Sequence, residues 1–131
     1  MPIPFVRLQD YLDSIVQNAG ESPAGAPHKR FWSSYQNLTA NPLPNPKCNG
    51  QNIFPVKYTD PQHTVVDADG SPLYIILTSA NGFCGREQMP PGGPFITDAG
   101  YSVTLSDGST VTGTQITQDI HDWLAAGAPN D

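Results

Sequence analysis

The sequence predicts a single, mostly α-helical domain with one β-hairpin and long loops rich in proline and glycine. Apolar residues recur at helical spacing near both ends of the chain, and two alternating Val/Thr/Leu runs flank one Ser-Asp-Gly-Ser turn. The 14 prolines and 12 glycines restrict long helices and central strands. At 131 residues the chain suits one domain, with a helix and loop over residues 1–26 and the remaining structure over 27–131.

The first helix is predicted over Phe5 to Asn18, because apolar residues there follow mostly helical spacing and Pro4 suits a helix start. Its apolar positions are Val6, Leu8, Leu12, Ile15 and Val16. The next segment, AGESPAGAPH at residues 19–28, is small and rich in Pro and Gly, which predicts a loop.

A short aromatic helix is predicted next, within HKRFWSSYQNL at residues 28–38. Its aromatic and apolar residues follow an i, i+1, i+4, i+7 pattern that is typical of one buried face: Phe31, Trp32, Tyr35 and Leu38. Residues 41–52 alternate proline with asparagine and predict a loop, and Ile53 to Tyr58 predicts a short edge strand that Pro55 limits.

Three further elements are predicted in the C-terminal half. Ser71 before Pro72 is the pattern of an N-cap followed by proline, so residues 72–78 predict a helix. Residues 101–113 predict the hairpin, with Asp107 and Gly108 in its turn. A last helix is predicted from Thr114, ended by Gly127 and Pro129, with one apolar face formed by Ile116, Ile120, Trp123 and Leu124.

Cys48 and Cys84 are the only cysteines, and a pair so far apart cannot by itself provide the four ligands of a structural zinc site. A disulfide or two free thiols remain. We favour the disulfide because both residues lie in Gly/Pro-rich loops, and closing the loop between them would stabilise the fold by roughly 3 to 4 kcal/mol. A periplasmic or extracellular location is favoured if they pair, and a cytoplasmic one otherwise.

The charge and hydropathy of the chain exclude some partners. The net charge is -6, and the six Lys and Arg residues are scattered, so we expect neither nucleic acid nor anionic membranes as partners. The longest apolar run, Leu73 to Leu77, is far shorter than the roughly 18 residues that cross a bilayer. The N-terminus lacks the pattern of a signal peptide. We therefore expect a soluble protein without membrane insertion.

Two motifs near the C-terminus carry a resemblance to a known family. QMPPGGPFITD at residues 88–98 precedes QDIHDWLAAGAP at residues 118–129, and together they resemble the C-terminal half of class I c-type cytochrome domains. In that family an MPxGGP loop carries the methionine that ligates haem iron, and the next helix reads I-x-x-W-I-x-x-G-A-P. The resemblance implies a cytochrome c-like helical fold from residue 27 onward, with the hairpin as an insertion. Its matched residues are Met89, Ile120, Trp123, Gly127 and Ala128.

The haem-attachment motif of that family is missing. Class I cytochromes carry C-x-x-C-H after the first helix, where this chain has the loop at residues 19–28. Without thioether bonds and the proximal histidine, Met89 alone cannot retain haem covalently. PHKRFW at residues 27–32, together with the two later motifs, is similar to haem-less accessory domains of tyrosinase and copper-oxidase-type proteins. The three histidines, His28, His63 and His121, are too few for a type 3 copper centre.

Met89 and His28 are the candidate cofactor-binding residues, for haem or copper. The alternative is that Met89 fills the space of a haem, as an adaptable unbranched side chain can, and that His28 makes a hydrogen bond at a helix start. We favour packing and expect no cofactor and no metal site. We expect structural roles, besides the two cysteines, for Trp32, Trp123, Pro90, Gly92 and Gly93.

Signals for catalysis are weak. No serine or cysteine lies in a nucleophile motif, and VDADGS at residues 66–71 lacks the glycine and glutamate spacing of a calcium loop. Two pairs of carboxylates at helical spacing, Asp10 with Asp13 and Asp119 with Asp122, are interpreted as surface acids. His121 is expected on the exposed side of the last helix. No catalytic residue is predicted.

The expected function is that of a non-catalytic accessory subunit or binding domain that docks onto or stabilises an oxidoreductase partner. A second hypothesis is an electron-transfer protein that holds haem non-covalently through Met89 and a histidine. A third is a structural or assembly protein, with which the acidic surface, the hairpin edge and the possible disulfide are compatible.

Overall fold

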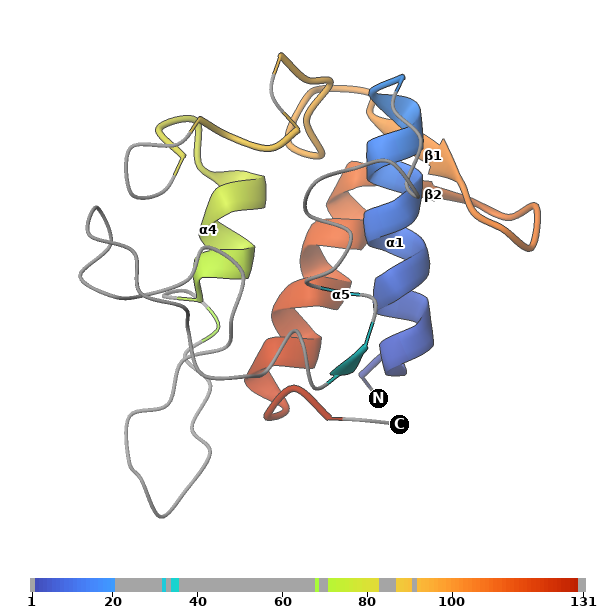
Figure 1. Ribbon diagram of the computed structural model, residues 1–131, viewed down its shortest axis with the longest axis vertical. Helices are drawn as coiled ribbons and strands as arrows, with labels where there is room; N and C mark the ends of the chain where they lie inside the picture. Colours follow the sequence, from blue (N-terminus) through green and yellow to red (C-terminus); the bar gives the residue numbers. More distant parts are fainter. Residues whose placement is uncertain are drawn as a thin grey trace.

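The computed structural model describes residues 2–20, 32, 34, 35, 68, 71–82, 87–90 and 92–129. This part of the chain contains three helices and one two-stranded antiparallel sheet, in the order α1 (Phe5–Asn18), α4 (Pro72–Thr78), β1 (Ser102–Thr104), β2 (Thr110–Thr112) and α5 (Gly113–Ala125). Figure 1 shows α1 beside α5, α4 on the other side of α5, and the hairpin projecting at one end of the helices.

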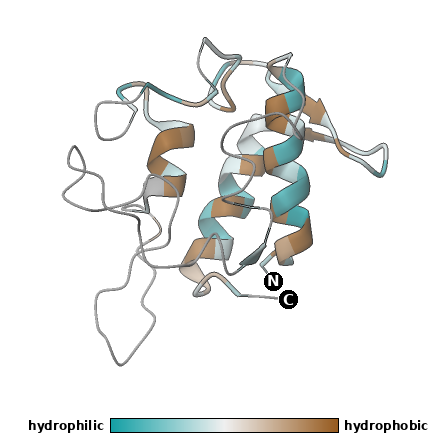
Figure 2. Cartoon of the chain, viewed as in Figure 1, coloured by the Kyte–Doolittle hydropathy of each residue, from teal (hydrophilic) through white to brown (hydrophobic). Residues whose placement is uncertain are grey.

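Helix α1 spans Phe5–Asn18, as its periodicity predicts. Pro4 stands at the N-cap position in an extended conformation, which suits a residue whose φ is fixed. One face is buried, formed by Phe5, Leu8, Tyr11, Leu12 and Ile15. Val6 does not belong to this face, because its side chain is 66% exposed. Figure 2 shows hydrophilic and hydrophobic residues on different sides of both long helices.

Helix α5 begins at Gly113, one residue before the predicted start. Thr112 caps it, since the side-chain oxygen accepts a hydrogen bond from the Gln115 backbone N–H at 3.1 Å. The helix ends before Gly127, whose φ of 93° favours glycine. The predicted apolar face is buried throughout and consists of Ile116, Ile120, Trp123 and Leu124.

The short helix α4 lies where the Ser-Pro pattern predicts it. Pro72 occupies the first turn and Ser71 the N-cap position, but the Ser71 side chain makes no capping hydrogen bond. Its hydroxyl is buried and has no hydrogen-bond partner among the described residues. What holds α4 in place is its apolar face, formed by Leu73, Ile76 and Leu77, which belongs to the same buried cluster as α5.

The predicted hairpin is confirmed. Strands β1 and β2 pair with Val103 opposite Val111, and Asp107 shapes the turn by accepting a hydrogen bond from the Ser109 N–H at 2.9 Å. The turn is also attached to α1, because the Ser106 hydroxyl donates to Asp10 Oδ2 at 2.7 Å. Arg7 forms an ion pair with Asp107 at 3.3 Å. The hairpin is therefore connected to the first helix of the chain.

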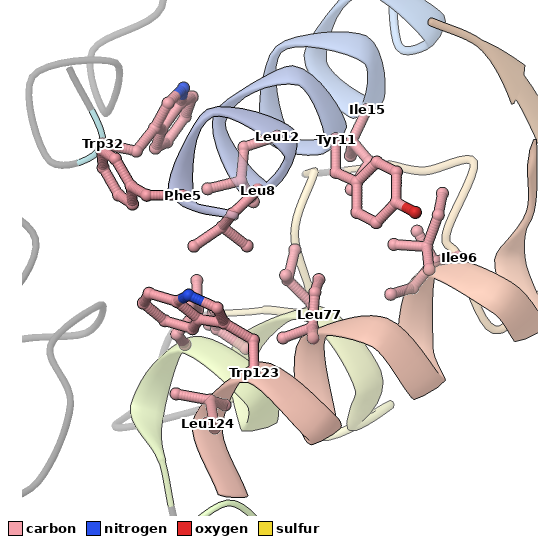
Figure 3. Close-up of a cluster of buried hydrophobic side chains, with 14 of the residues drawn as sticks. Phe5, Leu8, Tyr11, Leu12, Ile15, Trp32, Leu77, Ile96, Trp123 and Leu124 are labelled. Carbon is pink, nitrogen blue, oxygen red and sulfur yellow. The ribbon is translucent and has the colours of Figure 1, made fainter. Parts of the chain in front are cut away.

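One hydrophobic cluster joins all these elements (Figure 3). Leu8 and Leu12 of α1 face Trp123 of α5, and Leu77 of α4 and Ile96 approach the same centre. The Phe5 and Trp123 rings lie 6.4 Å apart between centroids. The predicted edge strand at 53–58, the loop at 41–52 and most of the predicted aromatic helix at 28–38 lie outside the described residues.

Candidate functional site

The loop that carries Met89 is attached to the C-terminal end of α4. The Met89 backbone N–H donates to the Ile76 carbonyl at 2.9 Å, and the Gln88 side-chain amide donates to the Leu77 carbonyl at 2.9 Å. Both carbonyls lie in the last turn of α4, where they lack helical partners. The same Gln88 amide reaches the Thr97 hydroxyl at 2.9 Å. Gln88, near the start of this loop, thus connects the later residue Thr97 to the end of α4.

The Met89 side chain is partly buried and packs against the hydrophobic cluster. Pro90 beside it is buried. Gly92 and Gly93 follow with φ values of 80° and 71°, a conformation that L side chains rarely adopt. A Cβ on Gly93 would in addition lie 3.3 Å from the Phe95 ring. The loop therefore depends on the residue types of its motif, and it brings a thioether to the edge of the core.

Trp123 lies at the centre of the same cluster and is fully buried. Its indole N–H donates to the Pro129 carbonyl at 3.0 Å, and the Ala128 N–H returns a hydrogen bond to the Trp123 carbonyl at 3.0 Å. The Tyr35 hydroxyl donates to the Ala128 carbonyl at 2.6 Å. The Gly-Ala-Pro end of the last helix thus folds back over the tryptophan that precedes it.

Trp32 is also buried, and it joins its segment to α1. Its indole N–H donates to Asp13 Oδ1 at 2.8 Å, and its carbonyl accepts from the Gln9 side chain at 2.8 Å. The helical spacing of Asp13 from Asp10 predicts a surface acid. That interpretation is wrong, because its carboxylate binds a buried ring from a segment 19 residues away.

Asp10 and Asp119 also have structural partners that the sequence did not reveal. Asp10 accepts from the Ser106 hydroxyl, and Asp119 accepts from the Tyr11 hydroxyl and from the Gln115 side chain. Asp122 differs from the other three acids, because its partners among the described residues lie in its own helix: the Gln118 amide donates to it at 2.8 Å, and His121 Nδ1 lies 4.0 Å from its Oδ1. A carboxylate that binds a distant hydroxyl leaves no local pattern in the sequence, so periodicity alone could not identify these contacts.

The candidate cofactor ligand His28 lies outside the described residues, as do Cys48, Cys84 and His63. His121 is described, and its side chain is 32% exposed. Its ring packs edge-on against Tyr74, with 5.4 Å between centroids. The expected exposed position of His121 is therefore corrected to a partly buried one between α5 and α4. Within the described ranges, no three His, Cys, Asp or Glu side chains are grouped so that they could hold a metal ion.

A second region, which sequence analysis missed, is an open groove of about 830 Å³. It lies between residues 96–101, the base of the hairpin and the first two turns of α5. Its lining is more apolar than polar, and most of the polar residues in it carry a hydroxyl, among them Thr97, Ser102, Thr110, Thr112 and Thr114. The sequence does contain many Ser and Thr residues between positions 102 and 117. Because the predicted hairpin accounts for them, they do not by themselves indicate a groove.

No helix of the described residues is both long and apolar enough to cross a membrane. Comparison with known proteins gives no match to this chain, whether against protein-family models, curated proteins or solved structures.

Proposed function

We propose that this chain is a non-catalytic accessory subunit or binding domain that docks onto an oxidoreductase partner and stabilises it. The scaffold proposed for this role is cytochrome c-like, without the motif for covalent haem attachment. The sequence resemblance in the Met89 loop and the last helix is the basis for the partner class. The geometry around these two motifs supports the proposal that the scaffold serves packing.

The observation that carries the proposal is the position of Met89. Its side chain packs against the hydrophobic cluster, and its backbone is fixed by the hydrogen bond to Ile76. A flexible, unbranched thioether fills irregular space at the edge of a core well. Trp123 occupies the centre of the same cluster. Met89 and Trp123, which come from the two motifs that carry the resemblance, thus pack in one hydrophobic core. A domain that keeps its fold without haem requires such a core.

The polar residues of the described segments support a non-catalytic role. Gln88, Asp13 and Asp119 are each engaged in a hydrogen bond that joins two segments. These hydrogen bonds give the three side chains a role in holding the fold together. The net charge of -6 favours a partner with a basic docking surface, because complementary charge accelerates association.

Reconstitution with the partner tests this function. Cross-linking in the source organism identifies the partner, which is then purified without the chain and titrated with it. We expect the thermal midpoint or the turnover of the oxidoreductase to rise with added chain, and the complex to weaken as salt increases. The purified chain alone should turn over no substrate. Turnover by the isolated chain, or a partner that is not an oxidoreductase, would contradict the proposal.

The second candidate is an electron carrier, which the thioether at the edge of the core favours. It requires non-covalent haem held by Met89 and a histidine, with His28 as the candidate. An absorption spectrum of the chain expressed with haem supplied separates the two functions. A Soret band that is lost in Met89→Ala and kept in Glu87→Ala, an exposed neighbour, supports the carrier. A flat spectrum removes it and leaves the accessory function.

A further inference from the structure

The groove beside α5 has the dimensions of a small-molecule site. Its volume is about 830 Å³, and ligand pockets in proteins typically occupy about 300 to 1,000 Å³. Two stretches of the chain line it: residues 96–102, which lead into β1, and residues 110–118, which include β2 and the start of α5. A Cβ on Gly113 would lie 1.9 Å from the Ile96 carbonyl oxygen. The two stretches thus approach closely at Gly113, whose backbone N–H donates to the Tyr101 carbonyl at 2.9 Å.

The hairpin presents hydroxyls to this groove because of the alternation of side chains along its strands. Val103 is buried, so its neighbour Ser102 lies on the opposite face of β1. Ser102 is paired with Thr112 of β2, and side chains of directly paired residues lie on the same face. Ser102, Thr110 and Thr112 all line the groove. One face of the hairpin therefore serves the core and the other the groove.

The groove offers both hydrogen-bond donors and acceptors. The Thr112 hydroxyl oxygen accepts from the Gln115 N–H, so its own O–H can donate outward. The Thr117 hydroxyl donates to the Gly113 carbonyl at 2.8 Å, which leaves its oxygen to accept. The Gln118 amide nitrogen donates to Asp122, which leaves its carbonyl oxygen to accept. A ligand hydroxyl, which is donor and acceptor at once, matches such a lining.

The charge of the lining indicates an uncharged ligand. Among the described residues that line the groove there is no Lys, Arg or His, and Asp98 is the single carboxylate. From these described residues a phosphate or carboxylate ligand would receive no charge-assisted hydrogen bond, because none of them is a cation. Asp98 already accepts a hydrogen bond from the Phe95 N–H at 2.9 Å, and it has acceptor capacity left for a ligand hydroxyl.

From these observations we propose that the groove between residues 96–101, the outer face of the hairpin and the start of α5 binds an uncharged, hydroxyl-rich small molecule, namely a neutral sugar. The Ser and Thr hydroxyls and the Gln118 carbonyl exchange hydrogen bonds with the sugar hydroxyls, and Asp98 accepts from one of them. This activity goes beyond the accessory function and does not depend on it.

An NMR titration of the isolated chain tests the proposal. The probes are glucose, maltose and N-acetylglucosamine, with glucuronate, glucosamine and inorganic phosphate as charged counterparts. We expect saturable shifts of the amides in 96–102 and 110–118 with at least one neutral sugar, at a dissociation constant on the order of 1 mM. No saturable shift with any neutral sugar, shifts that map elsewhere, or tighter binding of a charged probe would overturn it.

Two variants with a matched control sharpen the test. Thr110→Val and Thr114→Val each remove the hydroxyl of an exposed residue that lines the groove, with little change in side-chain shape. Together the two substitutions should weaken the affinity for the sugar by about tenfold or more. Thr104→Val is the control, since Thr104 is an exposed threonine opposite Thr110 on the same face of the hairpin but is not among the residues that line the groove. Equal affinity in the double variant and the control would refute the site. The experiment needs no partner, so its failure leaves the accessory function intact.

Discussion

The hydroxyl of Tyr11 donates a hydrogen bond to the carboxylate of Asp119 and so joins α1 to α5 across 108 positions of sequence. The Tyr11 ring is buried, and the Arg7 guanidinium lies 5.4 Å from its centroid. Gln115 donates to the other oxygen of Asp119 at 2.8 Å. Two helices from opposite ends of the chain are thus connected by a polar contact at the margin of their apolar interface.

Tyr11→Phe should lower the free energy of unfolding by about 1 to 2 kcal/mol, because the variant keeps the buried ring and removes only the hydrogen bond to a charged acceptor. Urea unfolding, with an unchanged denaturant slope, measures the loss. Asp122→Asn is the matched control, since Asp122 is exposed and its partners among the described residues lie in its own helix. It should change stability by less than about 0.5 kcal/mol. An equal loss of stability in the two variants would contradict a stabilising hydrogen bond between Tyr11 of α1 and Asp119 of α5.

The stability of the chain should fall in alkaline solution. Burial raises the pKa of Tyr11 and of Tyr101 above the ordinary value of 10.0, and the hydrogen bond to Asp119 raises that of Tyr11 further. Below pH 10 both phenols are neutral in the folded and unfolded states, so their contribution is fully present. Above it the unfolded chain releases these protons first, and stability is lost as the pH rises toward the folded pKa values.

The thermal midpoint measured from about pH 8 upward follows this loss, and ultraviolet titration of tyrosinate locates the late-titrating phenols. The double variant Tyr11→Phe, Tyr101→Phe should lose less stability between neutral and alkaline pH than the parent chain does. A midpoint that falls as steeply in the double variant would assign the alkaline sensitivity to other groups.

The elements that sequence analysis predicted well are those specified by local patterns. Helix α1 matches its predicted bounds, and α5 starts within one residue of its prediction. The hairpin follows from its alternating Val and Thr residues. Each signal needs only neighbours within a few positions along the chain, where periodicity and turn chemistry act.

What the sequence could not show depends on contacts between distant segments. Val6 is apolar like the buried residues of α1 but is exposed to solvent, because the hydrophobic cluster contacts only one side of this helix. Asp13 looks like any helical surface acid until the Trp32 indole is placed beside it. The groove likewise arises only when residues 96–101 meet the start of α5. Contacts between distant segments leave no characteristic residue spacing in the sequence.

Gly113→Ala should destabilise the fold, although alanine is normally the better helix former. The added Cβ would lie 1.9 Å from the Ile96 carbonyl oxygen and 3.2 Å from the Tyr101 Cβ, so backbone must shift to admit it. We expect a loss of about 1 to 3 kcal/mol, the usual range for overpacking. Thermal or urea unfolding measures it.

The control for this variant is Thr114→Ala, at the exposed next position of α5. Because alanine has the higher helix propensity, this change should be neutral or slightly stabilising. A Gly113→Ala variant as stable as Thr114→Ala would mean that α5 and residues 96–101 are not in close backbone contact.

Gln88→Leu should loosen the loop that carries Met89. The variant removes the donor that serves the Leu77 carbonyl and the Thr97 hydroxyl at a position only 5% exposed. Thr97 is exposed, but the Leu77 residue is buried, and leaving its carbonyl without a donor costs about 1 to 3 kcal/mol. Hydrogen exchange of the Met89 amide, which is bonded to Ile76, should accelerate, since it reports local opening of the loop. Glu87→Gln, at the exposed neighbour, should leave both quantities unchanged.

Gln88→Glu distinguishes the lost donor from lost packing, because it keeps the size of the side chain. At neutral pH its carboxylate would face the Leu77 carbonyl, an acceptor against an acceptor, and the variant should be less stable than the parent chain. Burial and this carbonyl raise the pKa of the new carboxyl group, so the protonated form regains a donor as the pH falls. The stability difference from the parent should therefore shrink in acid and widen as the pH rises through the folded pKa. A difference that is constant with pH would show that the hydrogen bond from Gln88 does not hold the Met89 loop to α4.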